Sequence, residues 1–181
     1  MADYQSNKGH DLTLHALFYL YAQIVSLPKE QDASTVVSSI YEKFLLSVAQ
    51  ALRASLPASD KSLSRLLGKS PFLPESTLKL LESLCHPDTI DHQSREVASR
   101  DRVTQGLRVV WSLILLRPVT RIACLNIALQ CAVHDINEVQ AKAIRLVANK
   151  PYPHEYLSQN IEQFATEMLL STVDSRQSLP N

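Results

Sequence analysis

Apolar residues recur at helical spacing along almost the whole chain, and prolines divide this pattern into segments. Breaks fall at Pro28, Pro57, Pro87, Pro118 and Pro151. Because proline lacks an amide hydrogen and its ring clashes with the preceding turn, helices end or begin at such positions. Only three glycines are present, and no segment alternates apolar and polar residues over a useful length. The sequence therefore predicts an all-α protein whose short turns make successive helices antiparallel neighbours.

The breaks and the apolar spacing predict where individual helices lie. We expect helices over residues 10–26, 34–56, 101–116 and 119–133, a short helix between Asp60 and Gly68, one beginning at Pro74, and a last one capped by Ser158. Gly68 is expected to end its helix in a left-handed conformation. Residues 86–99 carry no helical pattern and predict a loop. We expect the polar ends, residues 1–9 and 175–181, to be flexible.

Residues 134–150 read as one complete amphipathic helix. Asp135 is a candidate N-cap, and Glu138 three residues later completes a variant of the capping box. The expected buried residues of this helix are Ile136, Val139, Ala143, Leu146 and Val147. The small Ala143 permits close approach of a neighbouring helix, and Gly106 inside residues 101–116 also predicts a close helix crossing. The spacing of Asp135, Val139 and Ala143, with apolar residues one turn later, resembles the second helix of a HEAT hairpin.

These features together predict a HEAT/armadillo-like α-solenoid of antiparallel helix pairs over residues 10–174. A closed helical bundle is the structural alternative. In the helix over residues 34–56, the expected buried stripe holds Val37, Ile40, Tyr41, Phe44, Val48, Ala51 and Leu52. Trp111 is expected to belong to the core rather than to form a stacking platform.

The motifs that usually carry enzyme chemistry do not occur in the sequence. Neither a glycine-rich phosphate loop nor a G-x-S-x-G elbow is found. Cys124 and Cys131 lie seven helical positions apart, about 10 Å along the axis, which is too far for one zinc ion. Together with Cys85 there are three cysteines, which cannot all form disulfides within the chain, so we expect them to be buried free thiols. We therefore expect no enzyme activity, cofactor, metal, small-molecule substrate or membrane span. The alternative is a catalytic Ser–His–Asp triad assembled from residues far apart in the sequence, which no local motif would reveal.

The formal net charge is zero, but the charges are unevenly distributed along the chain. Residues 95–150 contain nine basic and four acidic side chains, a net charge of +5. The candidate partner-binding residues are Arg108, Arg117, Arg121, Lys142, Arg145 and Lys150. The alternative interpretation is an ordinary solvated face, and nucleic-acid binding would require the cations to gather on one surface. We expect charge reversal at Arg117, Arg121 and Arg145 to preserve folding and to abolish binding of at least one partner.

Several runs of sequence resemble the symplekin family, most closely its plant forms. They are residues 102–107 (RVTQGL), 111–118 (WSLILLRP), 56–61 (LPASDK), 64–68 (SRLLG), 71–74 (PFLP) and 142–150 (KAIRLVANK). The last run, followed by a Tyr-Pro turn, is the most specific. The similarity covers roughly residues 10–174.

The resemblance implies a nuclear, non-catalytic scaffold of the pre-mRNA 3′-end cleavage and polyadenylation machinery. Its implied partners are protein subunits of that complex. Symplekins are much longer helical-repeat proteins, so the resemblance also implies that this chain is an internal segment. Two alternatives remain: a HEAT-like adaptor in another pathway, and direct RNA binding through residues 95–150.

Overall fold

The computed structural model describes residues 8–27, 32–85 and 96–177, and all regular structure within these ranges is helical. The elements are α2 (Lys8–Ser26), α3 (Asp32–Ser55), α4 (Ser62–Lys69), α5 (Glu75–Cys85), α6 (Glu96–Leu116), a 3-10 turn η1 (Pro118–Thr120), α7 (Arg121–Ala132), α8 (Asn137–Asn149) and α9 (Glu155–Gln177). The predicted all-α class is confirmed, because no strand occurs in these three ranges.

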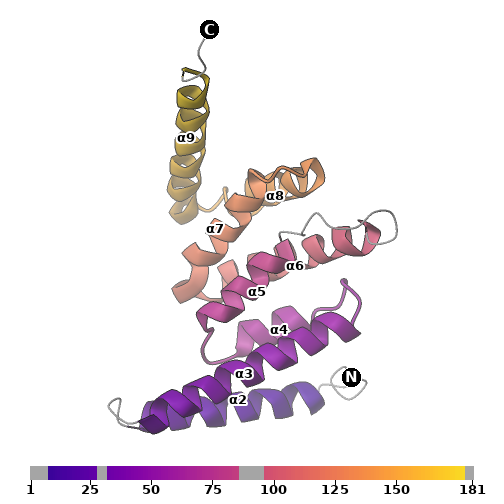
Figure 1. Cartoon of the computed structure of the whole chain (residues 1–181), viewed down its shortest axis with the longest axis vertical. Coiled ribbons are helices and arrows are strands. Elements are labelled where there is room, and N and C mark those ends of the chain that lie inside the picture. The colour runs from indigo at the N-terminus through magenta and orange to yellow at the C-terminus, as the bar shows by residue number, and fades with distance from the viewer. Residues whose placement is uncertain (1–7, 28–31, 86–95, 178–181) are drawn as a thin grey trace.

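The helices form an elongated stack with α2 and α3 at one end and α9 at the other (Figure 1). The main packing contacts join helices that are close in sequence, such as α2 with α3, α6 with α7 and α7 with α8. Packing between successive elements is typical of a solenoid and differs from a closed bundle, in which first and last helices share one core. The open stack therefore agrees with the predicted α-solenoid.

One apolar cluster runs through the stack. It contains Leu17 of α2, Leu45 of α3, Leu113 of α6 and Leu125 of α7, none of which is exposed. It continues to Ala143 of α8, which is also fully buried, as its small side chain predicts. Trp111 is only partly buried and packs against the edge of this cluster, so it does not belong to the fully buried core.

A tyrosine ties the second helix to the connector between α4 and α5. The Tyr41 hydroxyl donates to the Phe72 carbonyl oxygen at 2.6 Å and accepts from the Phe72 N–H at 3.2 Å. Burial raises the pKa of Tyr41, so the hydroxyl keeps the proton that it donates. The connector thereby gains partners for both backbone groups of Phe72.

The start of α8 differs from the prediction. Ile136, not Asp135, precedes the first helical residue, and no side chain caps this helix. The imidazole Nδ1 of His134 accepts the Ile136 N–H at 3.0 Å, so the backbone turns one residue later than expected. Glu138 extends toward Lys142, with 3.1 Å between their charged atoms, and therefore does not complete the expected capping box.

The prediction for Gly68 is also wrong. Gly68 lies inside α4, which continues to Lys69, and its φ is not positive. Ser70 ends the helix in an extended conformation, because the residue before a proline avoids the helical region. A side chain at Gly68 would begin 3.0 Å from the Leu116 Cδ1 atom, so this glycine lies within a helix beside the end of the Leu116 side chain and forms no turn.

Several predicted boundaries shift. Residues 96–99 of the expected 86–99 loop belong to α6, and residues 86–95 lie outside the described ranges. Lys8 and Gly9 are helical, as are residues 175–177, whereas 1–7 and 178–181 are not described. The last helix begins at Glu155 instead of Ser158, whose hydroxyl donates to the Glu155 carbonyl at 3.0 Å. A carboxylate in the first turn suits the helix dipole.

Candidate functional site

A groove of about 370 Å³ lies between α6 and α8. Its lining residues are Thr104, Leu107, Arg108, Lys142, Arg145, Leu146, Asn149 and Lys150. Four of them are cations, and no carboxylate occurs among these lining residues. We call this feature the basic groove. Four of the six candidate residues predicted from the sequence thus converge on one surface.

Helical periodicity explains the convergence. On α8, Lys142, Leu146 and Asn149 fall one turn apart and form a stripe beside the one that packs into the core. Thr104 and Arg108 lie one turn apart on α6 and face the same groove. The two helices therefore supply opposite walls of the basic groove.

The floor of the basic groove is apolar and its rim is charged. Leu107 is only 4% exposed, and Leu146 is partly buried against the core. Arg108, Arg145 and Lys150 are exposed, whereas Lys142 forms an ion pair with Glu138. The arrangement can hold a ligand that carries both negative charge and apolar surface.

Arg117 has a different role from the four cations of the groove. Its guanidinium donates to the backbone carbonyl of Ser70. It also lies within hydrogen-bond distance of three further carbonyl oxygens: Leu67 at 3.3 Å, Gly68 at 3.5 Å and Pro71 at 3.4 Å. These carbonyls belong to the end of α4 and the residues after it, where intrahelical partners run out. Burial lowers the pKa of Arg117, as expected for a cation enclosed by the protein. Arg117 therefore joins the end of α4 to the end of α6.

Arg121 also makes contacts within the protein. Its Nε donates to the Ile114 carbonyl in the last turn of α6 at 2.9 Å, and its guanidinium lies 4.8 Å from the centre of the Tyr156 ring. It thus stabilises the end of α6 and contacts α9. Because Arg117 and Arg121 bridge helices, the expectation that their reversal would preserve folding does not fit this geometry.

The aromatic side chains near these arginines stack on one another. The ring centroids of Trp111 and His154 lie 5.9 Å apart, and those of His154 and Tyr156 lie 5.5 Å apart. None of these rings belongs to the lining of the basic groove. The groove therefore offers no aromatic platform among its described lining residues.

All three cysteines are buried and form no disulfide. The Cys131 thiol lies 3.9 Å from the Cys85 carbonyl oxygen. Burial raises the pKa of Cys124 to about 11, and hydrogen bonding with Cys131 together with burial raises that of Cys85. The raised pKa values make Cys124 and Cys85 poor nucleophiles. Hydrogen bonding with Cys85 lowers the pKa of Cys131, so this thiol is protected by its burial. Within the described ranges, no three His, Cys, Asp or Glu side chains are placed to share a metal ion.

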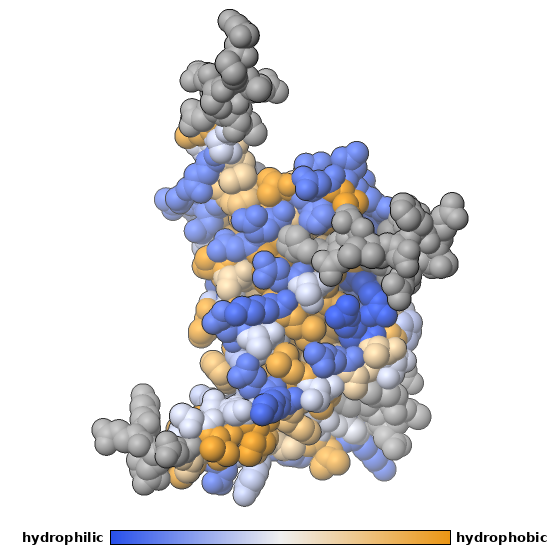
Figure 2. All heavy atoms as spheres, viewed as in Figure 1, coloured by the Kyte–Doolittle hydropathy of each residue, from blue (hydrophilic) through white to orange (hydrophobic). Residues whose placement is uncertain are grey.

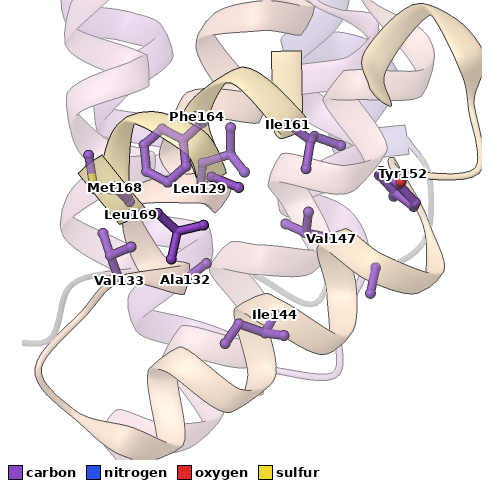
Figure 3. Close-up of a pocket in the computed structure, with 12 residues that line it drawn as sticks. Leu129, Ala132, Val133, Ile144, Val147, Tyr152, Ile161, Phe164, Met168 and Leu169 are labelled. Atoms are coloured by element: carbon purple, nitrogen blue, oxygen red, sulfur yellow. The ribbon is translucent and has the colours of Figure 1, made fainter. Parts of the chain in front are cut away.

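A second groove, of about 520 Å³, opens between α7, α8 and α9. Figure 3 shows Phe164, Met168 and Leu169 of α9 facing residues of α7 and α8 across it. Its lining is apolar except for Tyr152, and Leu169 is 68% exposed. We call this the apolar groove. The sequence did not predict this groove, because the exposure of apolar residues such as Leu169 depends on which helices pack against α9.

No protein-family model matches this chain, and no solved structure was found to match it. Within the described ranges, no helix combines the length and the apolar character needed to cross a membrane.

Proposed function

We propose that this chain is a non-catalytic scaffold segment of the nuclear pre-mRNA 3′-end cleavage and polyadenylation machinery. The resemblance of residues 102–107, 111–118 and 142–150 to symplekins supports the pathway. The all-helical stack supports the scaffold role, since stacked helix pairs present long surfaces to protein partners.

The observation that carries the scaffold role is the apolar surface at both ends of the stack. On α2, Leu12 is 72% exposed and Tyr19 is 66% exposed, and on α9 Leu170 is 61% exposed. Figure 2 shows hydrophobic residues gathered on the surface at the α2–α3 end. Extended apolar patches of this kind mark protein interaction sites, and solenoids need polar caps where no neighbour covers the last repeat.

Affinity purification from nuclear extract tests the proposal. With the chain immobilised, we expect cleavage and polyadenylation subunits to be enriched over a column that carries an unrelated helical protein. Recovery of transport receptors or chromatin proteins alone would replace the proposed pathway with the adaptor alternative. Recovery of RNA that survives nuclease treatment, without those subunits, would favour direct RNA binding.

A further inference from the structure

We propose that the basic groove binds an acidic segment of a partner protein, in which carboxylates flank one large apolar side chain. This inference rests on the proposed protein-binding role of the chain and not on the pathway. Both parts of the ligand follow from the groove itself, the charge from its rim and the apolar anchor from its floor.

The rim calls for carboxylates. Arg108 comes from α6, and Arg145 and Lys150 come from the other wall, so a peptide lying along the groove would have cations on both sides. Arginine presents a planar fork that matches a carboxylate with two parallel hydrogen bonds. The cations lie in a concave surface, where the field is stronger than over a flat one. Recognition of acidic motifs by arginine clusters is a recurrent binding mode.

The floor calls for an apolar side chain. Leu107 is 4% exposed and Leu146 is partly buried, so the floor offers an apolar surface on which one side chain of a ligand can pack. A volume of about 370 Å³ is near the lower end of known ligand pockets, about 300–1,000 Å³, and accommodates an anchoring side chain rather than a whole helix.

The lining favours a peptide over single-stranded RNA. Sequence-tolerant RNA binding needs aromatic rings on which bases stack. The described lining residues include no aromatic ring. Trp111 and Tyr156 lie outside this lining, where Trp111 stacks on His154 and the Tyr156 ring contacts Arg121. Phosphate contacts alone would leave the leucine floor unused.

Fluorescence anisotropy with the full chain tests the inference. The probes are labelled synthetic peptides in which Asp and Glu surround a single Leu, Phe or Trp, matched peptides with Ser at the anchor position, and a U-rich oligonucleotide of equal charge. The variant Arg108→Glu/Arg145→Glu reverses one cation on each wall. Its matched control is Lys43→Glu/Lys61→Glu, which changes net charge equally at two exposed residues outside the groove. Circular dichroism and thermal unfolding establish that both variants fold.

We expect at least one anchored acidic peptide to bind at low ionic strength and to bind more weakly as salt is added. The groove variant should weaken this binding by roughly tenfold or more, and the control by about twofold at most. The Ser-anchored peptides should bind more weakly than their parents.

Three results would overturn the inference. They are no binding by any anchored peptide at low salt, equal loss in both variants, or preferential binding of the oligonucleotide that the groove variant abolishes. The last result would assign the groove to RNA. None of these bears on the enrichment of processing subunits from extract, which another surface could produce, so failure here is distinguishable from failure of the proposed pathway.

Discussion

Gly106 of α6 lies directly against Cys85 of α5. A methyl group at the Gly106 Cα would begin 2.7 Å from the Cys85 Sγ atom and 3.1 Å from the Leu84 Cβ atom. Side chains do not approach so closely, so only glycine permits this crossing. The expectation that Gly106 marks a close helix contact is confirmed.

Replacement of this glycine should therefore destabilise the protein. Gly106→Ala gains about 1 kcal/mol of helix propensity. We expect the clash to outweigh this gain, because overpacking of a rigid interior typically costs about 1–3 kcal/mol. Urea denaturation measures the free energy of unfolding. Cys85→Ala removes the sulfur atom that would clash with the new methyl group. The double variant Cys85→Ala/Gly106→Ala should therefore lose less stability than the sum of the two single changes. A more stable Gly106→Ala protein would contradict the close crossing.

Arg117→Ala should lower the free energy of unfolding by about 1–3 kcal/mol, because it leaves carbonyls at the end of α4 without their donor. Arg117→Lys should recover only part of the loss, since an ammonium cannot reproduce the planar fork. Arg108→Ala is the control: Arg108 is exposed on the rim of the basic groove, and its loss should change stability by less than about 0.5 kcal/mol. Equal effects at Arg117 and Arg108 would contradict the bridging role of Arg117.

The buried thiols should resist modification in the folded state. The pKa of Cys124 is about 11, so less thiolate is present at any given pH than for a cysteine at 9.0. Labelling of Cys124 by iodoacetamide near about pH 8 should follow the rate of unfolding, because both burial and protonation protect its sulfur. Rapid labelling of the native protein would show that these cysteines are accessible.

The same shift sets a pH dependence of stability. The folded-state pKa of Cys124 is raised, so its contribution to stability is complete below the unfolded value of 9.0. The contribution is lost as pH rises toward about 11, because the unfolded chain releases its proton first. Cys124→Ala should flatten the fall in unfolding free energy over this window. If Cys124→Ala leaves the pH dependence of the unfolding free energy unchanged, the Cys124 thiol does not cause this dependence.

The helices could be predicted from sequence because their limits are set locally. Helices α2, α3 and α6 end two residues before Pro28, Pro57 and Pro118 in the sequence, and the small Ala143 is fully buried as expected. The predicted helix end was wrong where another nearby residue determined the backbone conformation. His134 took the Ile136 N–H and displaced the expected cap, and Pro71 fixed the end of α4 beyond Gly68.

Which face of a helix is buried depends on tertiary packing. In α3, Tyr41 and Leu52 are buried as expected, but Ile40 is 49% exposed while Leu45 is fully buried. Apolar residues cover an arc of this helix that is wider than the face buried in the core, so periodicity alone does not select the buried stripe. Its neighbours decide the orientation.

The candidate site was predicted as residues but not as geometry. Arg108 and Arg145 lie on different helices, and their convergence depends on how α6 and α8 are rotated about their axes. The sequence groups Arg117 with these cations, because its hydrogen-bond partners lie about 46 to 50 positions earlier in the chain and no local pattern connects them to it. Burial and long-range backbone contacts distinguish Arg117 from the cations of the groove.

The most direct test of the account compares two charge-reversed proteins in nuclear extract. Both Arg108→Glu/Arg145→Glu and Lys43→Glu/Lys61→Glu change the net charge equally, but only the first alters the basic groove. Quantitative mass spectrometry after affinity purification should show cleavage and polyadenylation subunits retained by the unmodified chain and by the control. At least one subunit should be lost from the groove variant. Identical recoveries from both variants, or recovery of no processing subunit by the unmodified chain, would contradict a scaffold that acts through this groove.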